Sequence, residues 1–135
     1  MTREARRRQI AALVVPRLDT GEELLGMSVT WAARVGRTAL PFTGLLFTGR
    51  HLHLLALTDR RLFVFERRSR GNGEAEPVLA ELIEHLALER ARSLLTMYQV
   101  LVVASDGRRL VFEFRFRDRA TGRALARMLR ATRQL

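Results

Sequence analysis

The stretch MYQVLVVASDGRRLVFEFRFR, residues 97–117, decides the fold. Two apolar runs, Met97 to Ala104 and Arg109 to Arg117, flank the turn sequence Ser105-Asp106-Gly107-Arg108. Asp-Gly between alternating runs is the strongest short-range signal for a β-hairpin. Strand side chains alternate between two faces, so the second run has one apolar and one charged face. We expect Leu110, Phe112, Phe114 and Phe116 on the inward face and Arg109, Glu113, Arg115 and Arg117 on the outward face.

Two further regions upstream of this hairpin predict strands. Residues 22–34 alternate, with Leu25, Met27, Val29 and Trp31 on one side and Ser28 and Thr30 on the other. Such a pattern is typical of a half-buried strand whose polar face meets water. The runs Leu52 to Leu57 and Arg61 to Arg67 are separated by three polar residues and predict a second hairpin. The second of these runs is apolar on both faces, which indicates a central strand.

The region Val78 to Leu95 is ambiguous. Its alanine, glutamate and leucine content favours a helix by propensity, although Leu79 to Leu82 could also form a strand. The preceding segment, Ser69 to Glu76, is rich in glycine and polar residues and predicts a loop.

Helices are expected at both ends. Thr2 can cap a helix over residues 2–15, and Pro16 follows its end. This helix is weakly amphipathic, so it either packs on the domain or lies as a basic helix on a membrane surface. Asp118 can cap a second helix that continues towards the C-terminus. Its apolar stripe, which must face the core, consists of Ala124, Leu125, Met128 and Leu129.

The length of 135 residues suits one domain, and 47% of the residues are hydrophobic, enough for one core. No run approaches the roughly 20 apolar residues of a membrane span, and no secretion signal is expected. The absence of cysteine excludes disulfides, thiolate metal sites and thiol nucleophiles, and it suits a reducing, cytoplasmic location.

The formal net charge is +10, and all 24 basic residues are arginine. A GC-rich genome would favour arginine codons, so the excess has a compositional explanation beside a functional one. In either case guanidinium groups stay charged and can pair with carboxylates or phosphates. A chain this basic favours an anionic partner.

The passage ALTDRRLFVF at residues 56–65 resembles the strand-turn-strand of the bacterial pleckstrin-homology-like (PH-like) domains. Residues 88–94, LERARSL, are similar to a downstream passage of the same family, and Leu101 to Val103, Asp106-Gly107 and Phe112 to Phe114 continue the resemblance. It covers residues 22–133.

The resemblance implies a mainly β fold with a C-terminal α-helix. Two packed, near-orthogonal antiparallel sheets would form a barrel with one end plugged by that helix. An N-terminal helix at residues 1–17 would then be appended to a PH-like domain at 18–135. For the ambiguous region it implies a strand to about His85 followed by a short irregular passage. It also implies a binding role, but the basic pattern of phosphoinositide-binding members is absent near Arg34 and Arg37.

Two candidate sites follow. The C-terminal helix carries arginines opposite its apolar stripe, and the strand before it adds two more. We expect these arginines to form a candidate anion-binding surface or, alternatively, only a solvated face of the helix. Its members are Arg115, Arg117, Arg119, Arg123, Arg127, Arg130 and Arg133.

The segment 36–50 is a candidate partner-docking loop, or a loop that covers one end of the core. Its apolar residues are Leu40, Phe42, Leu45 and Phe47.

Nothing in the sequence predicts catalysis. There is no Gly-x-Ser-x-Gly, Walker or dinucleotide motif, and we expect no enzyme activity, cofactor or metal. His51 and His53 share a strand face but have no carboxylate at a convincing spacing.

The sequence thus favours a non-catalytic adaptor that contacts a protein partner or itself. An alternative is peripheral binding to anionic phospholipid through the arginine-rich helix. Nonspecific nucleic-acid binding is a weaker alternative, because one tyrosine and one tryptophan offer few stacking platforms.

Overall fold

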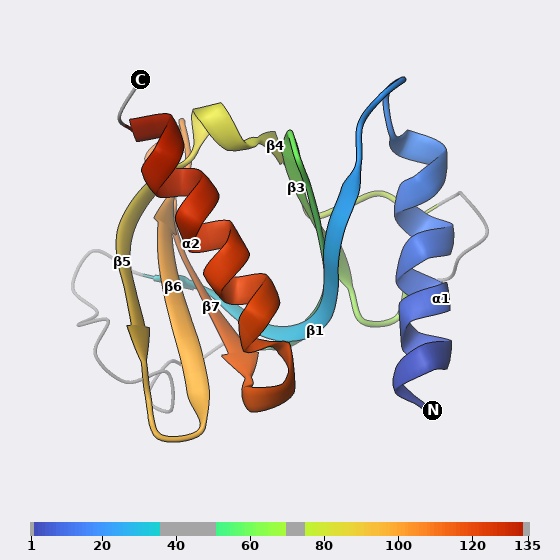
Figure 1. The fold of residues 1–135 in the computed structure, drawn as a ribbon, viewed down its shortest axis with the longest axis horizontal. Coiled ribbons are helices and arrows are strands. Elements are labelled where there is room, and N and C mark those ends of the chain that lie inside the picture. Colours follow the sequence, from blue (N-terminus) through green and yellow to red (C-terminus); the bar gives the residue numbers. More distant parts are fainter. Residues whose placement is uncertain (1, 36–50, 70–74, 134–135) are drawn as a thin grey trace.

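A computed structural model describes residues 2–35, 51–69 and 75–133, which form one antiparallel sheet and two α-helices (Figure 1). The helices are α1 (Arg3–Val14) and α2 (Arg119–Arg133), with short 3₁₀ turns η1 (Val15–Arg17), η3 (Ile83–His85) and η4 (Phe116–Asp118). The strands are β1 (Leu24–Val35), β2 (His51–Thr58), β3 (Arg61–Glu66), β4 (Leu79–Leu82), β5 (Ala87–Ser93), β6 (Met97–Val103) and β7 (Arg109–Arg115). None of the helices in these ranges is long and apolar enough to cross a membrane.

The seven strands have the order β4-β3-β2-β1-β7-β6-β5, with every neighbouring pair antiparallel. The long strand β1 joins the two halves. Its residues from Leu24 to Ala32 pair with β2, and those from Thr30 to Val35 pair with β7. Both predicted hairpins are confirmed, and Gly107 has φ +88° in the Asp-Gly turn. Glycine reaches that conformation without steric cost.

The main core lies between the sheet and α2, which crosses one side of the strands (Figure 1). The apolar stripe of α2 is confirmed, since Leu125 is fully buried, Leu129 is 1% exposed, and Ala124 and Met128 are partly buried against the same core. Phe112 and Phe114 of β7 pack in the same cluster. This is the arrangement that an amphipathic helix over a sheet requires.

A second core lies on the other side of β1, β2 and β3, where α1 packs (Figure 1). The hydroxyl of Thr2 accepts a hydrogen bond from the N–H of Ala5 and caps α1 as expected. Ile10, Leu13 and Val14 are fully buried against this side of the sheet. Helix α1 is therefore packed on the sheet through its buried apolar residues.

The helix favoured by propensity in the region Val78 to Leu95 is wrong. These residues form β4, η3 and β5, and β5 pairs with β6 from Ala87 to Ser93. The strand to about His85 that the resemblance implied is closer to the structure. The observed strand β4 ends at Leu82, however, and the strand β5 follows the 3₁₀ turn η3 in place of the expected irregular passage. Pairing with β3 and β6 overrides the local preference, which amounts to less than about 1 kcal/mol per residue.

The expectation of a water-facing polar side on β1 is also wrong. Ser28 is 3% exposed and Thr30 is fully buried, and their hydroxyls form a 2.5 Å hydrogen bond. Ser28 pairs with Leu55, whose side chain belongs to the core beneath α2. Because α1 covers the opposite face, both sides of β1 are covered along this part.

Two side chains of the last hairpin also differ from expectation. Glu113 is 1% exposed rather than outward in water, since Trp31 and Gln99 flank it on the neighbouring strands. Phe116 was expected in the inward-facing strand. It lies instead in η4, where the chain turns into α2, and its side chain is 63% exposed.

Candidate anion-binding surfaces

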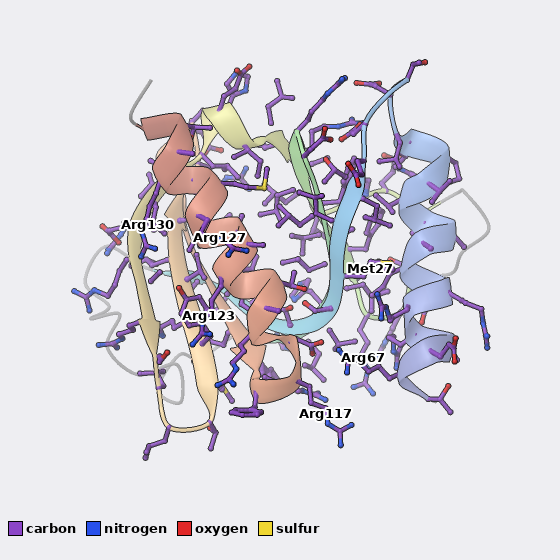
Figure 2. All side chains as sticks on the ribbon, viewed as in Figure 1. Met27, Arg67, Arg117, Arg123, Arg127 and Arg130 are labelled. Carbon is purple, nitrogen blue, oxygen red and sulfur yellow. The ribbon has the colours of Figure 1, made fainter. Side chains whose placement is uncertain are left out.

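Four arginines lie along the solvent face of α2, and we call them the α2 ridge: Arg119, Arg123, Arg127 and Arg130. All four are exposed, and Figure 2 shows Arg123, Arg127 and Arg130 following one another along the helix. Helical spacing places them there because the opposite side of α2 carries the buried stripe. Arg133 ends the helix, but its side chain lies outside the described residues.

Two arginines of the α2 ridge lie beside aromatic rings. The guanidinium of Arg119 lies 3.9 Å from the ring centroid of Phe116, and that of Arg123 lies 5.7 Å from the ring of Tyr98. Over the part of the chain that the structure describes, none of the four forms an ion pair with a carboxylate. Their charge is therefore available to an external anion.

Two large apolar side chains are exposed at the end of the molecule where α2 begins. Phe116 is in η4, and Leu95, in the turn between β5 and β6, has a relative exposure of 103%. Figure 1 shows this turn, η4 and the start of α1 along the same edge. This edge of the molecule therefore carries exposed apolar side chains close to the arginines at the start of α2.

Arg115 and Arg117 were grouped with the helix arginines, but they also line a hollow beside α1. This hollow, which we call the arginine recess, has a volume of about 290 Å³. Its arginines come from α1, from the residue after β3, and from the end of β7 and the following turn η4; they are Arg3, Arg6, Arg7, Arg67, Arg115 and Arg117. Figure 2 shows Arg67 and Arg117 near this end of the molecule, below Met27.

Four of these six arginines were not singled out from the sequence. The run Arg6-Arg7-Arg8 is visible in the sequence as a charge cluster, but by itself it indicates only a basic helix. Arg67 carries no local signal at all. Only the packing of α1 across β1 and β2 brings residues 3–7, 67 and 115–117 around one hollow.

One carboxylate, that of Asp118, lines the recess among the described residues. Its Oδ1 lies 3.7 Å from Nη2 of Arg3, which also approaches the carbonyl oxygen of Arg117 at 3.4 Å. Burial raises the pKa of Asp118 above its ordinary value, against the opposing effect of Arg3, Arg115, Arg117 and Arg7. The carboxyl group thus sits among guanidinium groups in a place that is poorly solvated.

A second hollow of about 280 Å³ opens where β1 ends and β2 and β7 begin. It is mostly apolar, with Phe112 and Leu110 in its wall, and His51, His53 and Arg108 supply polar groups. No three His, Asp or Glu side chains in the described ranges are arranged to hold a metal ion. The predicted docking residues Leu40, Phe42, Leu45 and Phe47 lie outside the described residues.

The comparisons with known proteins find similarity at the level of structure. No family model and no curated sequence matches the chain. Among solved structures, the Vps36 N-terminal PH domain is similar with a TM-score of 0.57 and 16% identity, over 87% of this chain and 86% of that one. An apo structure of the activated truncation of Vav1 is similar with a TM-score of 0.50 and 10% identity, over 81% of this chain but 26% of that one.

The architecture supports the same assignment on its own terms. The resemblance implied two near-orthogonal antiparallel sheets and a C-terminal helix; in the structure the strands form one continuous seven-stranded antiparallel sheet, which the long strand β1 joins at its middle, and α2 covers one side of it. At these identities the likeness concerns the fold alone. The chain has a PH-like fold with an additional N-terminal helix.

Proposed function

We propose that this chain is a non-catalytic binding module that docks on an anionic membrane surface through the α2 ridge. The observation that carries the proposal is the row of four exposed guanidinium groups without acidic partners among the described residues. A basic residue close to an anionic leaflet contributes about 1 kcal/mol. The exposed ring of Phe116 at the start of α2 can add apolar contact with the lipid interface.

The proposal also includes the domain organisation and the location of the protein. Residues 18–135 would form the PH-like domain, with residues 1–17 appended to it, in a cytoplasmic protein that binds the membrane peripherally. The passage at residues 56–65 supports membership in the bacterial PH-like group. A PH-like fold supports a binding role rather than catalysis.

Replacing Arg123, Arg127 and Arg130 with glutamine is expected to weaken binding to phosphatidylserine-containing vesicles by about a hundredfold, from three contributions of about 1 kcal/mol each. Co-sedimentation at a series of salt concentrations measures the affinity, which should fall steeply as salt rises.

A matched control removes the same charge elsewhere by changing Arg60, Arg68 and Arg90, which are exposed and lie outside the ridge, to glutamine. This control should retain most of the affinity. An equal loss in both variants would mean that net charge alone is sensed. Failure of the wild-type chain to bind phosphatidylserine-containing vesicles would contradict the proposal.

A second candidate function is contact with a protein partner or a second copy of the chain. The observation in its favour is the edge strand β4, whose last residue, Leu82, is 36% exposed and whose preceding residue, Val78, is 47% exposed. An edge with apolar neighbours can pair with another strand. Light scattering over a range of concentrations should then show a dimer that Leu82→Glu abolishes, and a monomer at every concentration would argue against self-association.

A further inference from the structure

We propose that Leu95 and Phe116, which we call the apolar tip, penetrate the lipid interface when the chain docks on an anionic membrane. The inference rests on the proposed function and deepens it. The α2 ridge supplies the electrostatic attraction, and the apolar tip decides which end of the domain enters the membrane. The membrane class that follows is an anionic bilayer with loosely packed headgroups, such as a highly curved one.

The apolar tip consists of the two most exposed large apolar side chains among the described residues. Leu95 has a relative exposure of 103%, so it projects fully into water, and Phe116 is 63% exposed. Scattered single apolar side chains are ordinary on a protein surface, whereas neighbouring ones mark a contact site. The positions of Leu95 and Phe116 relative to each other are therefore decisive.

Strand pairing places both residues at the same end of the sheet. Met97, the first residue of β6, pairs with Arg115, the last residue of β7. Leu95 precedes Met97 by two residues and Phe116 directly follows Arg115, so both continue beyond the last pair in the same direction. Neighbouring strands lie about 4.8 Å apart, so the two side chains start from adjacent places. Figure 1 shows the β5–β6 turn and η4 along one edge.

The backbone on both sides of the apolar tip is held by regular structure. The N–H of Leu94 donates to the carbonyl oxygen of Met97 at 2.7 Å and closes a tight turn with Leu95 inside it. The N–H of Arg119 donates to the carbonyl oxygen of Phe116, which ties η4 to the start of α2. Because the tip is presented by a turn and a helix start, little conformational entropy is lost on docking.

Basic side chains surround the apolar tip. Arg115, Arg117 and Arg119 are all exposed and come from the same passage as the phenylalanine ring. The carboxyl group of this passage, that of Asp118, is 15% exposed and lies 3.7 Å from Arg3. Apolar side chains among basic ones match a bilayer with anionic headgroups. Two copies of the chain that met here would bring like charges together, so a bilayer is the favoured partner.

Arg119 joins the apolar tip to the α2 ridge. Its guanidinium lies 3.9 Å from the ring centroid of Phe116, and it is also the first member of the ridge. A long arginine side chain can keep its charge at the headgroup phosphates while the ring beside it enters the apolar layer. The tip and the ridge thus form one surface, in which the first turn of α2 lies deepest.

The first experiment removes the apolar tip without changing charge. Leu95→Ser with Phe116→Ser should weaken binding to phosphatidylserine-containing vesicles about a hundredfold, at about tenfold for each side chain that leaves water. The salt dependence should keep its steepness, because no charge is lost. Co-sedimentation measures both quantities, and the loss should be largest for small, strongly curved vesicles of the same composition.

The matched control is Val15→Ser with Val78→Ser, which removes apolar side chains that are 53% and 47% exposed away from the tip. Val15 follows the 12-residue helix α1, about 18 Å from its start, and Val78 lines the hollow where β7 begins rather than where it ends. This control should bind within a few-fold of the wild type. Equal losses in the two variants would overturn the proposal.

The second experiment measures penetration directly. The sequence contains no cysteine, so Leu95→Cys provides a single thiol for an environment-sensitive fluorescent label. Phosphatidylserine-containing vesicles should shift the emission of this label to the blue, and lipids brominated in their acyl chains should quench it. The same label at Val15→Cys should show neither effect. A label at position 95 that stays in water on bound vesicles would overturn the proposal.

The results separate this inference from the proposed function. If the Arg123, Arg127 and Arg130 variant loses binding and the tip variant does not, the ridge docks the chain and the apolar tip plays no part. If only the tip variant loses binding, the apolar tip is supported and docking through the ridge is wrong. A wild-type dimer in light scattering that the tip variant abolishes would assign the tip to self-association and overturn the proposal.

Discussion

Replacing Glu22 with alanine is expected to lower the free energy of unfolding by about 3 kcal/mol, as the loss of one partner from a buried ion pair does. The side chain of Glu22 is fully buried at the entry to β1. Its Oε2 accepts hydrogen bonds from Nε of Arg61 at 3.0 Å and from the hydroxyl of Thr58 at 2.6 Å. Its Oε1 accepts from Nη2 of Arg61 at 2.5 Å and from the N–H of Asp19 at 2.9 Å.

This network joins segments that are distant in the sequence. The guanidinium of Arg61 also donates to the carbonyl oxygen of Arg17 at 2.7 Å and lies 4.7 Å from the ring centroid of Phe63. It therefore connects the end of η1, the start of β1 and the β2–β3 turn. Without Glu22, Arg61, whose side chain is one-fifth exposed in the structure, would lose its bidentate partner, and the hydroxyl of Thr58 would lose an acceptor.

Urea unfolding followed by tryptophan fluorescence measures the difference in stability. Glu23→Ala is the matched control, because Glu23 is the exposed neighbour of Glu22 and its side chain should contribute less than about 0.5 kcal/mol. If Glu22→Ala and Glu23→Ala have the same unfolding midpoint, the network does not stabilise the fold.

The pH dependence of stability provides an independent check on the same carboxylate. The hydrogen bond from Arg61 is the largest cause that lowers the pKa of Glu22 from 4.5 to about 2. A folded-state pKa below the unfolded value means that the stabilisation is present above pH 4.5 and is lost as the pH falls towards 2. The stability advantage of the wild type over Glu22→Gln should accordingly shrink across that window. A constant difference over the same range would contradict the assignment.

Replacing Gly122 with alanine is the second change with a large expected effect. In a helix interior, glycine to alanine normally stabilises by about 1 kcal/mol. Here a β-carbon on Gly122 would lie 2.6 Å from Cδ2 of Phe114 and 2.9 Å from Cδ1 of Tyr98. Both rings are buried in the core, so α2 would have to move away from β6 and β7. We expect a net loss of about 2 kcal/mol, because overpacking costs about 1 to 3 kcal/mol.

Thermal unfolding of a double-mutant cycle separates the steric clash from helix propensity. Phe114→Leu makes space beside Gly122, so adding Gly122→Ala in that background should cost less than in the wild type. Equal costs in the two backgrounds would show that the ring of Phe114 does not limit position 122. A stabilised Gly122→Ala variant would contradict the close approach of α2 to the sheet.

Local sequence patterns determined both hairpins and the buried side of α2. Asp106-Gly107 sets the last hairpin because few residues adopt its turn geometry, and Leu125 and Leu129 repeat at helical spacing on an otherwise charged helix. The same spacing fixes where Arg123 and Arg127 lie once the stripe is buried. These features depend on residues that are close in the sequence, so they can be read from it.

Tertiary structure alone decided which faces are covered and which distant charges meet. The alternation in β1 is clear in the sequence, but Ser28 and Thr30 are interior because their face of the strand lies on the core beneath α2, while α1 covers the face of Met27 and Val29. The strand β5 exists because β6 offers a partner, against the local preference for a helix. The meeting of Arg3, Arg67 and Arg117 around one recess has no local signature, since it depends on contacts between segments more than 40 residues apart.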